Sequence, residues 1–130
     1  MTAAGGNHGR KRILVAEDDP ASRELILELL AAEGYQVEMT NDGRAALERL
    51  RVQPVPDLVM LDIQMPELDG YEVLKRLRTL PGLDSVPVVA FTAYAMTGDR
   101  DRAVAAGFDA YITKPIRIAA LREELRKFLT

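Results

Sequence analysis

The stretch LVMLDIQMP (residues 58–66) contains four apolar side chains in a row and then a carboxylate, Asp62. A short, continuous apolar run is typical of a strand that is covered on both faces, as in a parallel sheet with helices on either side. Pro66 and the pair Asp69-Gly70 follow soon afterwards, and such residues mark a turn and a helix start. We therefore expect a buried strand that ends at Asp62.

Similar apolar runs predict the other strands, and helical periodicity fills the segments between them. The predicted strands are residues 12–16, 36–40, 57–62, 86–93 and 109–113, and the predicted helices are residues 22–34, 41–51, 70–78, 97–107 and 118–129. Strands that alternate with helices imply right-handed crossovers and a parallel sheet covered on both faces. The sequence therefore predicts a doubly wound α/β domain with a five-stranded parallel sheet, and residues 36–40, which alternate, as an edge strand. Its ligand site should lie beyond the carboxyl ends of the strands.

The periodicity also predicts which side chains face the core. The expected inward residues are Leu25, Ile26, Leu29 and Leu30 in the first helix, Ala46, Leu47 and Leu50 in the second, Val73, Leu74 and Leu77 in the third, and Ile118, Leu121, Leu125 and Phe128 in the last. Asn41 or Asp42 should cap the second helix, and Gly34 should end the first. The helix at 97–107 has only a thin stripe of small apolar residues, so we expect it to be the most loosely packed.

Composition limits the possible functions. The chain has 130 residues, is 48% hydrophobic and carries a net charge of -3, which favours one domain at residues 12–130 after a flexible tail at residues 1–11. The charge balance argues against direct binding to nucleic acid or to a membrane surface. There is no cysteine, no apolar run near the roughly 20 residues that span a bilayer, and no signal-peptide core. We expect a cytoplasmic protein.

Polar residues collect where the predicted strands end. These ends carry Glu17-Asp18-Asp19, Asp62, Thr92 and Lys114. Asp19 precedes Pro20 and is explained as a helix N-cap. Close carboxylates resist joint ionisation unless a cation lies among them, and an all-oxygen site fits Mg²⁺. Asp18 and Asp62 are the candidate ligands, with Glu17 bonded to a metal-bound water.

A carboxylate beside Mg²⁺ can also be a nucleophile that attacks phosphorus. Lys114 could then neutralise one phosphoryl oxygen, and the Thr92 hydroxyl could donate to another. No glycine-rich phosphate loop follows the first predicted strand, which argues against a nucleotide-binding or flavin-binding version of the fold.

Four blocks, ILVAEDD, LVMLDIQMPELDGYEVL, VVAFTA and AGFDAYITKPI, resemble in order and spacing the receiver domain of bacterial two-component response regulators. The resemblance covers almost everything from Arg12 onward. It implies a flavodoxin-like receiver fold with strand order 2-1-3-4-5. It also implies that Asp62 accepts a phosphoryl group from a phosphohistidine on a histidine kinase or histidine phosphotransfer protein.

The resemblance also assigns roles to single residues. These are the acidic metal-binding pair Glu17 and Asp18, the phosphoacceptor Asp62, the metal-binding backbone carbonyl of Gln64, the switch hydroxyl Thr92, the switch aromatic Tyr111, the lysine Lys114, and a cis peptide bond between Lys114 and Pro115. Glutamate at position 17 is a departure, since aspartate is commoner there. Tyr111 is expected to turn inward when Thr92 moves toward the phosphoryl group. Gln64 and Tyr94 flank the expected path of the attacking water and are the candidates for setting the lifetime of the phosphorylated state.

The leading hypothesis is a signalling switch that signals through residues 91–129 to a separate downstream protein, since no output domain follows the last predicted helix. Three alternatives stay open: a receiver from a hybrid histidine kinase, a receiver that binds partners without phosphorylation, and a Mg²⁺-dependent phosphohydrolase. The last resembles haloacid dehalogenase enzymes, which carry the nucleophile on the first strand and a second aspartate two residues later. Here Asp62 is on the third predicted strand and Gln64 holds the second position. We therefore expect no enzyme beyond self-phosphorylation and slow autodephosphorylation.

Overall fold

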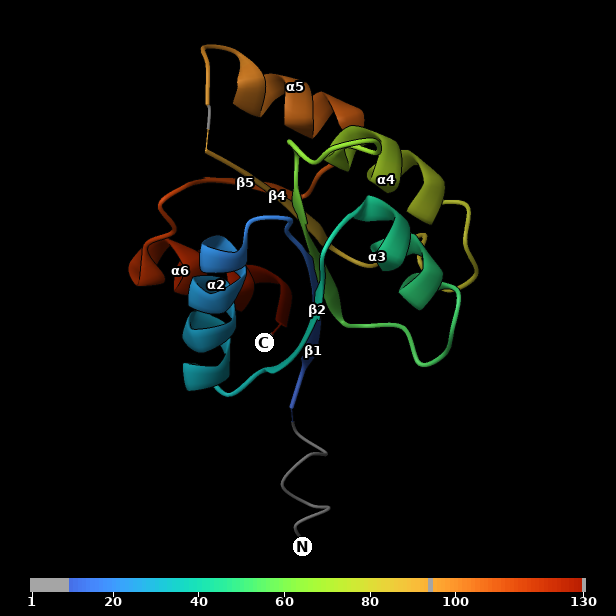
Figure 1. The fold of residues 1–130 in the computed structure, drawn as a ribbon, viewed down its shortest axis with the longest axis horizontal. Helices are drawn as coiled ribbons and strands as arrows, with labels where there is room; N and C mark the ends of the chain where they lie inside the picture. Colours follow the sequence, from blue (N-terminus) through green and yellow to red (C-terminus); the bar gives the residue numbers. More distant parts are fainter. Residues whose placement is uncertain (1–9, 94, 130) are drawn as a thin grey trace, which may run out of the picture.

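The computed structural model describes residues 10–93 and 95–129, which form a parallel sheet between two layers of helices (Figure 1). The elements in chain order are β1 (Arg12–Ala16), α2 (Pro20–Ala32), β2 (Gln36–Thr40), α3 (Gly43–Leu50), β3 (Leu58–Asp62), α4 (Gly70–Leu77), β4 (Val88–Thr92), α5 (Asp99–Ala106), β5 (Ala110–Thr113) and α6 (Ile118–Leu129). The five-stranded sheet has the order β2-β1-β3-β4-β5. Both the doubly wound architecture and the strand order are confirmed.

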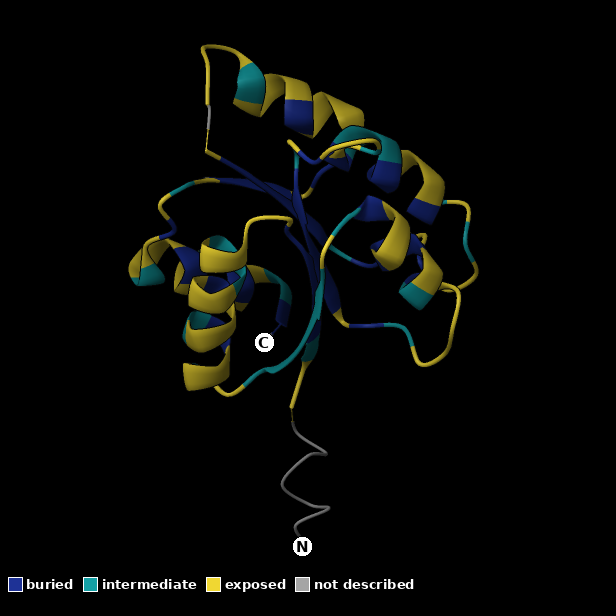
Figure 2. Ribbon diagram, viewed as in Figure 1, coloured by how far each residue is buried: buried dark blue, intermediate teal, exposed yellow. Residues whose placement is uncertain are grey.

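The sheet separates two hydrophobic clusters. One lies under α3, α4 and α5 and receives alternate strand residues such as Leu14 and Leu61. The other lies under α2 and α6 and receives the neighbouring residues, such as Val15 and Met60. Figure 2 shows the central strands buried between helices whose outer faces are exposed, with β2 partly buried. Because β1 and β3 contribute to both clusters, their sequences are continuously apolar rather than alternating.

Three helices begin at an aspartate whose side chain accepts a hydrogen bond from a backbone N–H three residues on. These are Asp19 for α2, Asp42 for α3 and Asp69 for α4, with distances of 2.8 to 2.9 Å. Such caps satisfy helix N–H groups that have no partner within the helix. The predicted cap at Asp19 is confirmed, and Asp42 rather than Asn41 caps α3.

Gly70 explains the Asp69-Gly70 pair. A Cβ at this position would lie 2.8 Å from the Asp62 carbonyl oxygen and 2.9 Å from the Ile63 Cα. Only glycine therefore lets the first turn of α4 lie directly against the carboxyl end of β3. The close approach fixes the backbone that carries Asp62.

The predicted core faces need two corrections. Leu25 is 43% exposed and Leu29 is only partly buried, whereas their helix neighbours Ile26 and Leu30 are buried. The buried stripe of α2 is thus narrower than the spacing suggested. In α6, Leu129 is buried in addition to the predicted Leu121 and Leu125, and the predicted Ile118 and Phe128 are only partly buried.

The remaining helix faces agree with the sequence. All the predicted inward residues of α3 and α4 are buried. In α5 only Ala103 is buried, in line with the thin stripe expected there. Among the described residues, no helix is both long and apolar enough to cross a membrane. The predicted tail at residues 1–11 lies outside the described residues, except for Arg10 and Lys11.

Candidate functional site

The carboxyl ends of four strands bring the predicted site residues to one edge of the sheet. Asp62 pairs in register with Phe91, and Thr92 pairs with Thr113. The backbone pairing continues past the strands, because the Glu17 N–H donates to the Thr40 carbonyl at 3.1 Å and the Lys114 N–H donates to the Thr92 carbonyl at 2.8 Å. These bonds extend the strand pairing of the sheet into the loops that contain Glu17 and Lys114.

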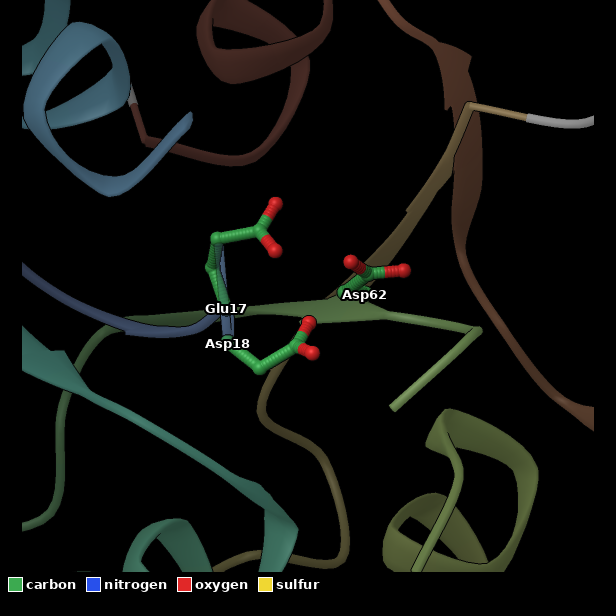
Figure 3. A group of neighbouring side chains, drawn as sticks. All are labelled: Glu17, Asp18 and Asp62. Atoms are coloured by element: carbon green, nitrogen blue, oxygen red, sulfur yellow. The ribbon is translucent and has the colours of Figure 1, made fainter. Parts of the chain in front are cut away.

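Three carboxylates lie together at this edge. Glu17, Asp18 and Asp62 each offer an oxygen, and these oxygens all lie within 4.8 Å of one another (Figure 3). Glu17 is fully buried and Asp62 is 3% exposed, whereas Asp18 is exposed to solvent. Burial raises the pKa of Glu17 above its ordinary value, although the Lys114 ammonium and the Asp19 N–H act in the opposite direction. The cluster therefore combines a buried interior with an opening at Asp18.

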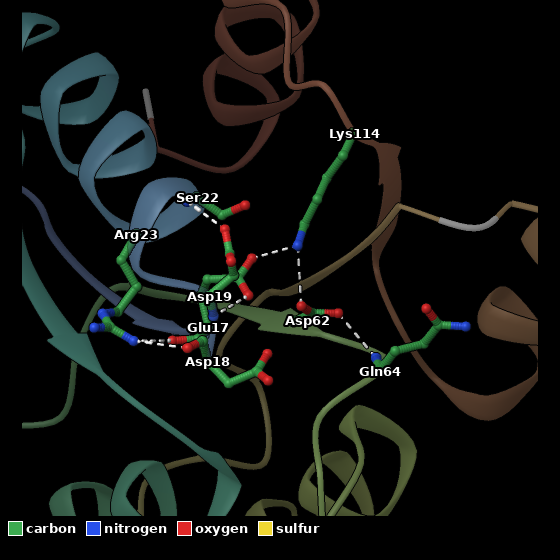
Figure 4. A network of polar contacts seen from close by, with 8 residues as sticks. All are labelled: Glu17, Asp18, Asp19, Ser22, Arg23, Asp62, Gln64 and Lys114. Carbon is green, nitrogen blue, oxygen red and sulfur yellow. Dashed lines mark hydrogen bonds and ion pairs between the residues drawn. The ribbon is translucent and has the colours of Figure 1, made fainter.

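Lys114 lies between two of these carboxylates (Figure 4). Its ammonium is 3.1 Å from Asp62 Oδ2 and forms an ion pair with Glu17. Burial lowers the pKa of Lys114, but its contacts with Glu17 and Asp62 together outweigh burial and raise the pKa above the ordinary lysine value. Lys114 is thus a fixed positive charge in the cluster. The predicted cis peptide bond between Lys114 and Pro115 is present.

Backbone donors complete the surroundings of the acids. The Gln64 N–H donates to Asp62 Oδ1 at 2.8 Å, and the Asp19 N–H donates to Glu17 Oε2 at 3.0 Å. Both oxygens of Asp62 therefore have a donor, one from the backbone and one from Lys114. The bond to Gln64 places its backbone at the site, and its role as a carbonyl ligand stays a prediction.

Thr92 and Tyr111 line one cavity beside the acids. The cavity has a volume of about 320 Å³ and also receives Gln64, Asp69 and Tyr71. Thr92 is 2% exposed and Tyr111 is 4% exposed. Burial raises the pKa of the Tyr111 hydroxyl, which has no hydrogen-bond partner among the described residues. The Tyr111 side chain is buried in this structure, and its inward turn as part of a switch stays a prediction. Tyr94 lies outside the described residues.

Arg23 is a residue of this region that the sequence did not single out. Its Nη1 donates to the carbonyl oxygens of Glu17, at 3.3 Å, and Asp18, at 3.0 Å. A sequence signal did exist, because an arginine one turn into a helix can reach back over the loop before that helix. The pattern gives no hint that the bond goes to the backbone.

Comparison with known proteins agrees with this geometry. The model of the response regulator receiver domain family matches residues 13–126. The polar-differentiation response regulator DivK of Brucella anthropi is 39% identical over 119 residues, which cover 92% of this chain and 96% of DivK. The chain therefore belongs to the response regulator receiver domain family, whose members are signalling proteins.

Two solved structures are also similar. The receiver domain of a sensor histidine kinase from Pseudomonas aeruginosa, with a magnesium ion coordinated in its active-site cleft, is 32% identical with a TM-score of 0.84, over 92% of this chain and 98% of that one. A chemotaxis protein of Vibrio cholerae is 25% identical with a TM-score of 0.84, over 92% of this chain and 99% of that one. Both structures share the fold described here.

Proposed function

We propose that this receiver is a phosphorylation-dependent switch in which Asp62 accepts a phosphoryl group from a phosphohistidine on a histidine kinase or histidine phosphotransfer protein. The observation that carries the proposal is the pair of donors on Asp62, with Gln64 N–H on one oxygen and Lys114 on the other. This arrangement fixes the orientation of the carboxylate at the sheet edge. A fixed carboxylate next to a permanent cation is a suitable nucleophile for phosphorus.

The transfer is a single displacement. A carboxylate oxygen of Asp62 attacks phosphorus, the P–N bond of the phosphohistidine breaks, and the imidazole nitrogen keeps the bonding electrons and takes a proton from solvent. Lys114 would move its ammonium from Asp62 toward a phosphoryl oxygen, and the Thr92 hydroxyl would donate to another. The product is an acyl phosphate on Asp62, which carries about 1.5 to 2 negative charges.

The donor set fits Mg²⁺, which prefers oxygen ligands and usually takes only one or two carboxylates. Asp18 and Asp62 would be those two, the Gln64 carbonyl would be a third ligand, and Glu17 would bond through water. A bound Mg²⁺ neutralises the charge of the phosphoryl oxygens, so that an anionic carboxylate can approach them. The magnesium ion in the similar Pseudomonas aeruginosa receiver supports this assignment. The exposed side of Asp18 offers the ion a route from solvent.

The size of the switching energy suggests how the signal passes on. Hydrogen bonds from Thr92 and Lys114 to a charged phosphoryl group would be worth roughly 1.5 to 3 kcal/mol each, less the contacts that both residues already make. A full reversal of a two-state equilibrium from 1:99 to 99:1 needs about 5.5 kcal/mol. Phosphorylation would therefore shift the population, and binding of a downstream protein to the face formed by residues 91–129 would complete the change. Tyr111 is buried within these residues and would be the switch aromatic.

Further roles belong to the same proposal. Gln64 and Tyr94 would set the lifetime of the acyl phosphate by controlling the approach of water. The protein would act in the cytoplasm, without direct contact to nucleic acid or membrane, and as a signalling protein rather than a turnover enzyme. The likeness to a receiver domain of a sensor histidine kinase favours a second candidate, in which the same switch operates as part of a hybrid kinase.

Intact-mass spectrometry after incubation with acetyl phosphate tests the proposal. We expect a gain of one phosphoryl group in the presence of Mg²⁺ and none in excess EDTA or in Asp62→Asn. Asp84→Asn is the matched control, because Asp84 is exposed and precedes β4 at the opposite edge of the sheet. A phosphoryl group that is still gained by Asp62→Asn would mean that another residue is the phosphoacceptor. No gain in folded wild-type protein would favour a receiver that binds its partners without phosphorylation.

A further inference from the structure

In the loop between β1 and α2, residues 17–19, one arginine bonds to every backbone carbonyl. The side chain of Arg23 donates to the carbonyls of Glu17 and Asp18, and its backbone N–H donates to the carbonyl of Asp19 at 2.9 Å. All three consecutive carbonyl groups therefore have the same partner residue. Figure 4 shows the guanidinium group on one side of this loop and the Asp18 carboxylate on the other, toward Asp62.

The three clustered acids are fixed in different ways. The side chain of Glu17 is held by the Asp19 N–H and by Lys114. The side chain of Asp62 is held by the Gln64 N–H and by Lys114. Within the described part of the chain, no donor bonds to the Asp18 carboxylate. Its position among the acids therefore depends on its own backbone, and Arg23 holds that backbone.

We infer that Arg23 is a positioning residue for the divalent cation, acting through the main chain of Asp18. By bonding to the Glu17 and Asp18 carbonyls, it directs the Asp18 carboxylate toward Asp62 before the cation arrives. The inference rests on the Mg²⁺ site of the proposed function and adds a residue outside the ligand set. Residues that orient metal ligands without touching the metal typically change metal affinity about 10- to 100-fold when they are removed.

If Arg23 acted only through its charge, its removal would change the Mg²⁺ affinity in the opposite direction. A guanidinium close to the site repels a second cation, so an arginine that acted only by its charge would weaken Mg²⁺ binding, and its removal would strengthen it. A purely structural arginine would change the stability of α2 and leave the affinity of the folded protein unchanged. The direction of the change in Mg²⁺ affinity therefore separates the three roles.

The test is isothermal titration calorimetry of the full chain with MgCl₂ at constant ionic strength. Arg23→Met removes the donors and the charge but keeps a straight side chain with good helix propensity. We expect it to bind Mg²⁺ about 10-fold more weakly than wild type. Arg23→Lys, which keeps N–H donors on a flexible side chain, should recover part of the loss. Arg76→Met is the control, since it makes the same charge change on α4, where the exposed Arg76 pairs with Glu72.

Thermal unfolding in EDTA establishes that each variant is folded at the temperature of the titration. Arg23→Met with wild-type or tighter Mg²⁺ affinity, or an equal loss in Arg76→Met, would overturn the inference. The wild type and Asp18→Asn separate this outcome from failure of the proposed function. If wild type binds no Mg²⁺, or if Asp18→Asn binds as well as wild type, the proposed metal site is wrong and the role of Arg23 falls with it.

Discussion

Glu17 is a site residue whose buried carboxylate lowers the stability of the fold. Its carboxylate is fully buried beside Asp62, and burial is the main reason that its pKa is raised. A buried carboxylate is tolerated only where partners offset the loss of water. Lys114 and the Asp19 N–H are those partners, and the raised pKa shows that they offset the burial only in part.

Stability should therefore depend on pH through this residue. A carboxyl whose pKa is higher in the folded than in the unfolded state lowers the free energy of unfolding as pH rises from the ordinary glutamate value through the raised one. We expect Glu17→Gln to be more stable than wild type at pH 7 in EDTA, and this advantage to shrink toward pH 4. Urea unfolding across this pH range measures the difference. Glu24→Gln, at an exposed position of α2, should show no such trend. An unchanged or lower stability of Glu17→Gln at pH 7 would mean that Lys114 fully offsets the burial.

At the scale of elements, α5 differs from the other helices in how it is attached. It buries only Ala103, and two of its arginines instead lie over aromatic rings. The Arg100 guanidinium is 5.2 Å from the centre of the Tyr111 ring, and that of Arg102 is 5.0 Å from the Tyr71 ring. Contacts between an exposed cation and a ring contribute only about 0.5 to 1 kcal/mol each. The helix is therefore attached by weak contacts, one of which involves the proposed switch aromatic.

Removing both arginines should loosen α5 and little else. We expect Arg100→Ala/Arg102→Ala to lower the free energy of unfolding by about 1 to 2 kcal/mol. Hydrogen exchange measured by mass spectrometry should become faster in α5 and stay unchanged in α6. Val104→Ala, which truncates an exposed residue of the same helix, is the control. Equal acceleration in both helices would show that α5 is not a separate unit of motion.

The elements also show which features the sequence predicts well. Strands β1, β3 and β4 were predictable because unbroken apolar runs need cover on both faces, and the acids stood where those runs ended. Leu25 was predicted wrongly because helical spacing gives the direction of the buried face but not its width. The backbone partners of Arg23 were not predictable, because a side chain that bonds to backbone carbonyls leaves no complementary residue type in the sequence. The periodicity of β5 does not describe the contact of the Tyr111 ring with Arg100 of α5, and an inward Tyr111 was expected only from the family resemblance.

At the scale of the whole molecule, the sheet divides the interior into two clusters that share no helix. Substitutions on opposite faces should therefore act independently, since sites without shared partners usually add within about 0.3 to 0.5 kcal/mol. Ile26→Val on the α2 side should cost about 0.5 to 1.5 kcal/mol, and Leu50→Ala on the α3 side about 2 to 5 kcal/mol. The double variant should show the sum in urea unfolding. A deviation of more than about 1 kcal/mol would mean that the sheet transmits strain between its faces.

The parallel order of the strands has a consequence for the protein during its synthesis. Glu17, Asp18 and Asp62 leave the ribosome well before Lys114, which follows the last strand of the sheet. A half-made chain therefore carries the acids without the ammonium that holds two of them together. The nascent polypeptide cannot assemble this constellation early and can complete it only after β5 has joined β4. Under the proposed function, a chain stalled or cut before that point would not compete with finished molecules for a phosphodonor.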